Sequence, residues 1–224
     1  MLAAEKIRKS YRRKQVLAGV SFQAKEGECV GIVGANGCGK TTLLSILAGA
    51  LKADGGSLVI DGEEALGKEK LFSRKVAYVP QENPLIPELT VRDNLSLWYK
   101  GGRKQLEQEL KKGAAAFLGI REMLPMTAGK LSGGMKKRLS IACALWSHAP
   151  YLVMDEPGAS LDLECKDLIR RYLEQYRREG GTVILTSHEM EELAVCTRMY
   201  VLKEGRLAQI PTGLGPEELI RLFH

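Results

Sequence analysis

One glycine-rich stretch constrains this chain more than any other feature, because it lies between a strand pattern and a helix pattern. Residues 29–33 form a short apolar run typical of a buried strand, and residues 42–48 carry the apolar face of a helix. The turn between them matches GxxxxGK[ST] and reads Gly34-Ala35-Asn36-Gly37-Cys38-Gly39-Lys40-Thr41. Glycines let successive backbone N–H groups and the helix N-terminus point at phosphate oxygens. The stretch therefore predicts a phosphate-binding loop.

Two further apolar runs, at 151–155 and 182–186, predict more buried strands. Apolar residues between them recur at spacings of three and four, which predicts an amphipathic helix; they are Cys165, Leu168, Ile169, Tyr172, Leu173 and Tyr176. Strand, helix and strand in this order form right-handed βαβ units. We therefore expect an α/β fold with a mainly parallel sheet.

Other segments predict structure at the sides of this core. Residues 20–24 alternate between apolar and polar, as on a half-buried strand, and turn residues at 53–56 and 61–62 bracket another strand in a hairpin-type pattern. A strand at 75–79 is stopped by Pro80. The next fifty residues instead predict helices, one of them capped by Thr90, with a second indicated by Leu106, Leu110 and Phe117.

Composition excludes several classes of protein. The 224 residues carry a net charge of +6, but basic and acidic residues are interleaved and no aromatic–basic repeat occurs, so we expect no nucleic acid partner. Five cysteines without a CxxC pair predict neither disulfides nor a zinc site. No apolar stretch reaches the ~18–20 residues that span a bilayer, and the first residues lack the apolar core of a signal peptide. We expect a cytoplasmic location.

The apolar run at 151–155 ends in two acids, Asp155 and Glu156. Burying unpaired charges is costly, so a buried strand places such acids at its mouth. In a phosphate-loop ATPase the first acid holds Mg²⁺ and the second orients or deprotonates the attacking water. Taken with the glycine-rich loop, this pair fits many nucleotide hydrolases.

A third motif, Leu131-Ser132-Gly133-Gly134-Met135, narrows the choice. Ser132 is a good helix cap, and the glycines expose helix N–H groups, so this is a second anion-binding helix end or a simple cap. Here the chain resembles the ATP-binding cassette (ABC) family, whose signature reads LSGGQ. The resemblance spans nearly the whole chain and includes further motif positions in the family's order: Tyr11, Gln81, Ser160-Leu161-Asp162 and His188. Met135 departs from the usual Gln, but Ser132 and both glycines are kept.

The resemblance implies a P-loop NTPase fold with a mainly parallel sheet, an N-terminal antiparallel β subdomain and a helical subdomain inserted at about 82–148. It implies one ABC ATPase domain over residues 1–224. It also implies that ATP and Mg²⁺ bind, with adenine stacked on Tyr11 and phosphates along 34–42, including Thr42.

The family's site residues carry over position by position. The resemblance implies that Lys40 contacts phosphate, and that the Mg²⁺ ligands are Thr41, Gln81 and Asp155. It implies that Glu156 polarises water and that His188 steadies the γ-phosphate. The signature residues of a second copy, Ser132, Gly133 and Gly134, are implied to grip that phosphate across the dimer.

The resemblance also implies partners. A second ATP-binding subunit is expected to pair head to tail, and a separate transmembrane permease is expected to contact residues 81–100 and hold the chain at the inner face of the membrane. Residues 87–99 resemble those of cassettes that serve simple exporters, so export is favoured over import. Two alternatives are a soluble ABC protein of translation or DNA repair and a regulatory cassette that does not hydrolyse ATP. The cargo is not encoded in this chain.

Cys38 lies inside the predicted phosphate loop, beside Lys40 and a helix N-terminus. Such surroundings favour a thiolate, so we hypothesise that a thiol reagent inactivates the protein and that ATP protects it. The alternative is a thiol that is turned inward and inert.

Overall fold

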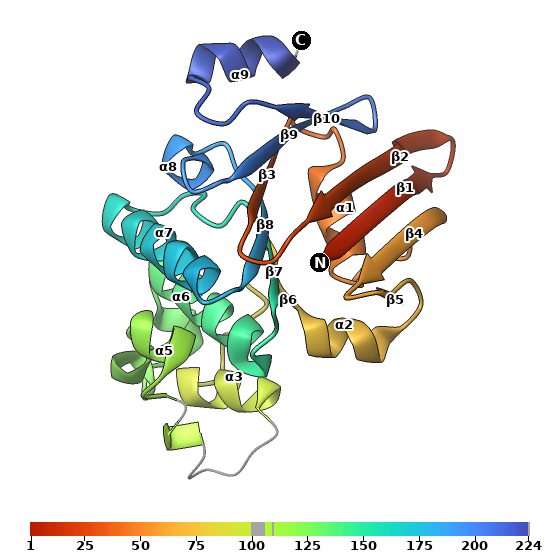
Figure 1. The fold of residues 1–224 in the computed structure, drawn as a ribbon. Helices are drawn as coiled ribbons and strands as arrows, with labels where there is room; N and C mark the ends of the chain where they lie inside the picture. The colour runs from red at the N-terminus through yellow and green to blue at the C-terminus, as the bar shows by residue number, and fades with distance from the viewer. Residues whose placement is uncertain (100–105, 109, 224) are drawn as a thin grey trace.

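The computed structural model describes residues 1–99, 106–108 and 110–223, which form two β-sheets flanked by helices (Figure 1). The larger sheet B has the strand order β10-β9-β3-β8-β7-β6. Its strands are β3 (Cys29–Val33), β6 (Val76–Val79), β7 (Tyr151–Asp155), β8 (Thr182–Thr186), β9 (Arg198–Lys203) and β10 (Arg206–Ile210). All neighbours are parallel except β9 and β10, which pair antiparallel.

Every residue of β3, β7 and β8 is buried, as expected for parallel strands that are covered on both faces. Because these strands are parallel, their carboxyl ends meet at one edge of the sheet. The segments that leave the sheet at that edge carry the glycine-rich loop, Glu156 and His188. The α/β class with a mainly parallel sheet is confirmed, and its topology gathers three separate motifs at one edge.

The smaller sheet A is antiparallel, with the order β2-β1-β4-β5. Its strands are β1 (Leu2–Tyr11), β2 (Lys14–Ala24), β4 (Gly55–Ile60) and β5 (Glu63–Glu64). Val20, Phe22 and Ala24 are buried while Ser21 and Gln23 are exposed, so the alternation seen in the sequence marks a half-buried strand. The N-terminal antiparallel subdomain is confirmed.

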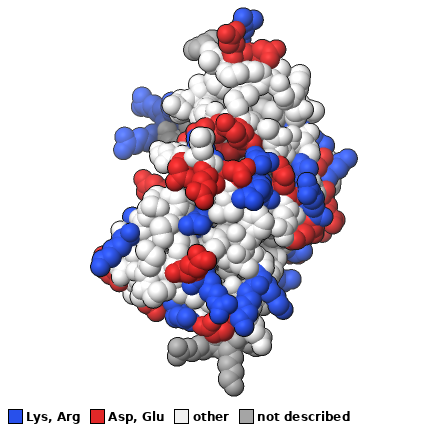
Figure 2. Space-filling view, turned by 90° about the vertical axis from the view of Figure 1, so that its left-hand side faces the viewer, with Lys and Arg blue, Asp and Glu red and all other residues white. Residues whose placement is uncertain are grey.

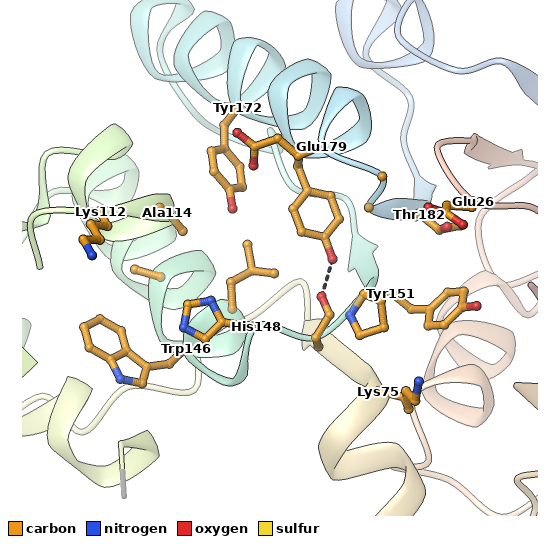
Figure 3. Close-up of a pocket in the computed structure, with 18 of the residues that line it drawn as sticks. Glu26, Lys75, Lys112, Ala114, Trp146, His148, Tyr151, Tyr172, Glu179 and Thr182 are labelled. Atoms are coloured by element: carbon orange, nitrogen blue, oxygen red, sulfur yellow. Dashed lines mark hydrogen bonds between the residues drawn. The ribbon is translucent and has the colours of Figure 1, made fainter. Parts of the chain in front are cut away.

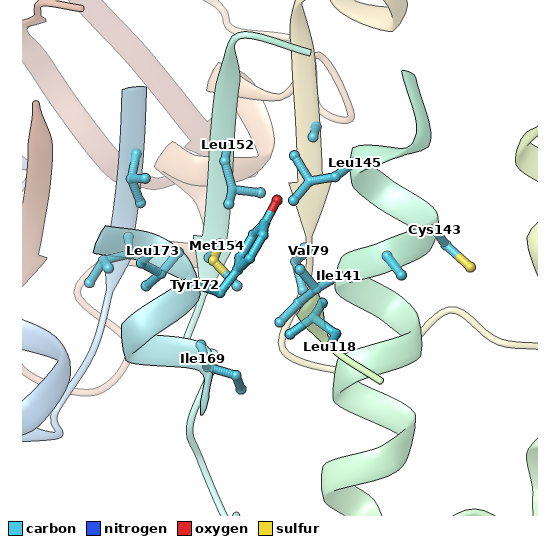
Figure 4. Close-up of a cluster of buried hydrophobic side chains, with 14 of the residues drawn as sticks. Val79, Leu118, Ile141, Cys143, Leu145, Leu152, Met154, Ile169, Tyr172 and Leu173 are labelled. Atoms are coloured by element: carbon cyan, nitrogen blue, oxygen red, sulfur yellow. The ribbon is translucent and has the colours of Figure 1, made fainter. Parts of the chain in front are cut away.

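Helices cover both faces of sheet B. They are α1 (Lys40–Leu47), α2 (Glu69–Lys75), α3 (Val91–Trp98), α5 (Gly113–Phe117), α6 (Gly133–Ala144), α7 (Leu163–Arg178), α8 (Met190–Leu193) and α9 (Pro216–Phe223), with short 3₁₀ turns at Ile120–Met123, Ala128–Lys130 and Leu145–Ser147. One core cluster joins α1 and sheet A to sheet B. In the other, Ile169 and Tyr172 of α7 and Ile141 of α6 lie beside Leu152 and Met154 of β7 (Figure 4). Among the described residues, every helix is too short or too polar to span a lipid bilayer.

The helical insert leaves the core after β6 and returns at β7, as expected from the sequence; its bounds of 82–148 stay a prediction. Thr90 caps α3 with a reciprocal pair of bonds: its Oγ1 accepts from the Asp93 N–H at 3.1 Å, and its own N–H donates to Asp93 Oδ2 at 3.3 Å. Asn94 is buried and its amide joins α3 to the preceding loop, accepting from the Ile86 N–H at 2.8 Å. These polar contacts fix the insert's first helix against the loop that begins at Gln81.

Charged side chains of both signs lie among one another on the face that carries α7 (Figure 2). Arg170, for example, pairs with Asp167 and Glu174 along this helix at 2.7 and 2.6 Å. On this face, basic and acidic residues that are interleaved in the sequence are therefore also interleaved on the surface.

The capping box of α3 generates a stability prediction. Thr90→Ala removes the side-chain acceptor of an N-terminal N–H group and should lower the free energy of unfolding by about 1 kcal/mol. Urea unfolding measures the change, and Thr90→Ser, which keeps the hydroxyl, should stay close to the wild type. Equal losses in the two variants would mean that the methyl group, and not the cap, contributes the stability.

Candidate functional site

The glycine-rich loop runs from the end of β3 to the start of α1. Gly34 and Gly39 have φ angles of 157° and 112°, which disfavour any side chain. A Cβ atom on Gly34 would lie 2.6 Å from the Leu202 carbonyl oxygen, and one on Gly39 would lie 2.8 Å from a methyl carbon of Val16. Both positions therefore require glycine. Gly39 offers α1 no side-chain cap, so the N–H groups at the start of the helix lie along the loop.

Lys40 spans this loop. Its Nζ donates to the Gly34 carbonyl at 2.8 Å and to the Ala35 carbonyl at 3.3 Å, and the residue is almost fully buried. Thr41, the next residue, is exposed, as are Ala35, Asn36 and Gly37. The loop thus has a buried ammonium group on one side and accessible backbone on the other, which is the arrangement that an anion needs.

The structure does not support the expectation that the surroundings of Cys38 favour a thiolate, and its reaction with a thiol reagent stays a prediction. The thiol is half-buried, and burial raises its pKa above the usual value, although Lys40 and backbone N–H groups act in the opposite direction. A Cβ atom on Gly34 would lie 2.8 Å from Cys38 Sγ, so the thiol lies close against the loop's own backbone. Loss of water here outweighs the nearby positive charge, and the structure favours the alternative of an inward thiol.

Asp155 is the last residue of β7 and is almost fully buried. Its Oδ1 accepts a hydrogen bond from Thr186 Oγ1 at 2.6 Å, across the parallel pair of β7 and β8. Its Oδ2 is buried and has no hydrogen-bond partner among the described residues. A carboxylate oxygen that is left unpaired beside the phosphate-binding edge fits a hard cation such as Mg²⁺.

Glu156 is the centre of the site. Its Oε2 accepts from Gln81 Nε2 at 3.2 Å, and its Oε1 lies 3.5 Å from His188 Nε2. Its backbone is left-handed, with φ 46°, and its N–H donates to the Thr186 carbonyl at 3.0 Å. Non-glycine residues in this region cost about 1–3 kcal/mol and cluster at functional sites. The structure therefore brings together three predicted site residues from three separate segments.

The signature motif begins α6 and stands apart from this cluster. Ser132 is the N-cap, and its Oγ accepts from the Met135 N–H at 3.2 Å. Ser132 and Gly133 are exposed. Gly134 packs on α7, where a Cβ atom would lie 3.1 Å from Cys165 Sγ. In the part of the chain that the structure describes, no hydrogen bond or ion pair joins the three signature residues to the 34–42 loop or to Glu156.

Tyr11 lies at the end of β1 and is 47% exposed. It pairs with Lys14 across the β1–β2 hairpin, and Val16 on the same hairpin reaches the glycine-rich loop at Gly39. The same hairpin thus carries the accessible ring of Tyr11 and the Val16 side chain that meets the loop.

Three further residues are buried around the site although no sequence motif marks them: Lys137, Thr186 and Glu192. Glu192 Oε2 accepts from Ser187 Oγ at 2.5 Å, next to His188. A Cβ atom on Gly158 would overlap Glu192 Oε1, so this carboxyl packs directly under the segment after Glu156. The burial of Lys137 could have been expected from the sequence. It lies four residues before Ile141, and residues four apart share one face of a helix, here the buried one.

A cavity of about 500 Å³ lies at the opposite edge of sheet B, near the amino ends of β7 and β8 (Figure 3). Trp146, His148 and Tyr172 line it, and the Tyr176 hydroxyl donates to the Ala149 carbonyl at 2.5 Å. Because Tyr151 and Thr182 also line it, the cavity lies at the far ends of the strands that carry Asp155 and Thr186. It is not part of the cluster around Glu156.

Comparisons with known proteins identify the family. Residues 17–159 match the model of the ABC transporter family. The linearmycin resistance ATP-binding protein LnrL of Bacillus subtilis is 36% identical, over 99% of this chain and 74% of that protein. A Nod factor export ATP-binding protein I of Burkholderia thailandensis is 38% identical, over 90% of this chain and 67% of that protein.

Solved structures match as well. A dimeric ATP-binding cassette in a post-hydrolysis state with ADP and Pi superposes with a TM-score of 0.84 at 27% identity, covering 96% of this chain and all of that one. A nucleotide-free cassette from an ABC transporter also has a TM-score of 0.84 at 27% identity, covering 100% and 94%.

The fold and the site define a P-loop ATPase. The chain belongs to the ABC transporter family, in which it is an ATP-binding subunit with an ATPase domain.

Glu192 generates a prediction about pH. The pKa of its carboxyl is raised to about 7, mainly by burial. The negative charge of Glu189 adds to this rise, whereas the hydrogen bond from Ser187 and the positive charges of Lys166 and Lys137 oppose it. Because this pKa lies above the unfolded value of about 4.5, the stability that the protonated form contributes is present at low pH and is lost as the pH rises through 7. The loss is about 3 kcal/mol at most.

Glu192→Gln keeps the side chain neutral at every pH, so its free energy of unfolding should fall less between pH 5 and pH 8 than that of the wild type. Urea unfolding at both pH values measures the difference, and Glu191→Gln, an exposed neighbour, is the control. If Glu192→Gln shows the same fall as the wild type, Glu192 is not the group that titrates.

Proposed function

We propose that the chain couples ATP hydrolysis to the export of a solute across a membrane, as one of two cassettes that pair head to tail. The observation that carries the proposal is the meeting of Gln81, Glu156 and His188 at the edge of sheet B where the phosphate-binding loop begins. The names of two relatives, a linearmycin resistance and a Nod factor export ATP-binding protein, support export.

In this proposal the loop from Gly34 to Thr42 binds the phosphates of ATP through its N–H groups, and Tyr11 stacks on the adenine. Lys40 exchanges its bonds with the loop carbonyls for phosphate oxygens, so that the desolvated ammonium is already in place. An ammonium group fixed in advance stabilises the charge that develops in the transition state without reorganisation.

Thr41, Gln81 and Asp155 would hold Mg²⁺, and Asp155 would offer its unpaired Oδ2 directly or through water. When bound, the ion neutralises charge on the phosphates. Thr186 keeps the other Asp155 oxygen hydrogen-bonded, so the carboxylate stays oriented.

Glu156 orients and polarises the attacking water. Gln81 and His188 hold its two carboxylate oxygens from separate segments, and both can move to the γ-phosphate region when the nucleotide binds. His188 then steadies the γ-phosphate as a hydrogen-bond donor.

The second cassette supplies what one chain lacks. Among the described residues, no bond joins Ser132, Gly133 and Gly134 at the N-terminus of α6 to the chain's own phosphate-binding loop, so these groups are available to a nucleotide on another copy. A two-fold axis makes both sites identical, and ATP is then shared between subunits. Dimeric cassettes among the structural relatives support this arrangement.

A separate permease would bind on the helical insert. Ile86, Leu97 and Trp98 are 43%, 61% and 51% exposed there, which is high for large apolar side chains. They lie within the segment 81–100 for which the family resemblance implies this contact; position 100 itself falls outside the described residues. Such a contact would keep the chain at the inner face of the membrane.

Lys40→Ala should lower the rate of Mg²⁺-dependent ATP hydrolysis by ~10²–10³, because it removes a charge that stabilises the transition state. Phosphate release by the purified protein measures the rate. Lys52→Ala removes the same charge from an exposed position and should leave the rate unchanged. Undiminished turnover in Lys40→Ala would show that the loop is not where ATP reacts.

Glu156→Gln should bind ATP but hydrolyse it ~10²–10⁴ more slowly, because the general base is lost. It should therefore be a monomer without nucleotide and a dimer with ATP, measured by light scattering after size exclusion. Adding Ser132→Arg should abolish the dimer, whereas adding Ser147→Arg, at an exposed serine beyond the other end of α6, should not. A Glu156→Gln protein that stays monomeric in saturating ATP would exclude self-pairing and favour a different cassette as the partner.

A further inference from the structure

A buried lysine lies beneath the site and has no part in the mechanism above. Lys137, on α6, is only 3% exposed. Its Nζ donates to the carbonyl of Pro80 at 3.1 Å and to that of Gln81 at 3.0 Å. Lysine is almost never buried to this extent without strong partners, and here the partners are backbone groups of the segment that delivers Gln81 to Glu156.

The placement of this lysine costs free energy. Burial lowers the pKa of Lys137, while Glu192 and Asp155 act against the shift from a distance. An apolar side chain at this helix position would fill the space without a desolvation penalty. The ammonium is therefore better explained by the two bonds it makes than by packing.

Those bonds act at the start of the loop, because the other backbone hydrogen bonds of this loop among the described residues begin at Asn83. β6 ends at Val79, and residues 80–90 belong to no helix or strand apart from an isolated bridge at Thr90. Carbonyls in such a segment need partners from elsewhere. Lys137 supplies two at once, to adjacent residues, which restricts both the position and the direction of the chain at Gln81.

We propose that Lys137 is a positioning residue that holds the backbone of Pro80 and Gln81 so that the Gln81 amide reaches Glu156. The inference rests on the proposed role of Gln81 in hydrolysis. Because Lys137 lies one and a half turns after the cap Ser132 on the same rigid helix, it ties the position of Gln81 to the helix end that faces the second cassette.

The test is a double-mutant cycle on ATP hydrolysis by the full chain. Lys137→Met keeps the length and apolar stem but removes the donors, and should lower kcat by about ten- to a hundredfold, as for small misplacements of a reacting group, with little change in KM. Gln81→Ala should lower kcat as well. If Lys137 acts through Gln81, the double variant should be no slower than Gln81→Ala, since a residue cannot position a side chain that is absent.

Three further variants separate positioning from general stability. Lys137→Gln, whose amide can donate to both carbonyls, should recover most of kcat, and Lys111→Met, which removes a charge from an exposed position of the insert, should leave it unchanged. Glu156→Gln with Lys137→Met should still dimerise with ATP, because the signature contacts are intact. If Lys137→Met fails to fold, the shorter Lys137→Leu serves in its place.

Several outcomes would overturn the inference. Wild-type kcat in Lys137→Met, a double variant whose kcat loss is the product of the two single losses, or no recovery in Lys137→Gln would each do so. A loss in Lys137→Met with none in Gln81→Ala would also overturn it, because the lysine would then act elsewhere. Failure of ATP hydrolysis in the wild type itself would instead contradict the proposed function.

Discussion

Parallel pairing of β3, β8 and β7 is the constraint on which the rest of this structure depends. Thr186, the last residue of β8, is in register with Ile32 on one side and Asp155 on the other. The three strands therefore leave the sheet together, and the loops at their carboxyl ends meet at one edge. Had one of these strands run the other way, its motif would lie at the edge that holds the distant cavity.

That edge also concentrates buried polar groups in an otherwise apolar core. Asp155, Lys137 and Glu192 are each almost fully buried. Asp155 and Glu192 each accept a hydrogen bond from a hydroxyl group, and Lys137 donates to two backbone carbonyls. Such groups contribute less to stability than apolar side chains of similar size would. The same compromise appears in the left-handed backbone of Glu156. The chain gives up some stability here and gains a fixed geometry around the phosphate-binding loop.

Much of the fold was predictable because the relevant forces are local. The buried strands at 29–33, 151–155 and 182–186 occur at these residues, and Thr90 caps a helix that begins at Val91. Boundaries were less reliable. The strand expected from Lys75 begins at Val76, because Lys75 ends α2, a seven-residue helix that no pattern marked. The helix expected from Thr42 begins at Lys40, directly after the positive-φ Gly39.

The phosphate-binding loop, the acidic pair and the signature motif can be recognised in the sequence alone, because each depends on residues adjacent in the chain and on backbone conformations that only certain residues adopt. Three other features depend on the packing of distant segments: Gln81 and His188 both reach Glu156, Lys137 bonds the carbonyls of Pro80 and Gln81, and burial raises the pKa of the Cys38 thiol. Distances and desolvation of this kind are set by neighbours from other elements. A side chain's type can be read from the chain, whereas its partners and its exposure to water depend on the packing of the whole domain.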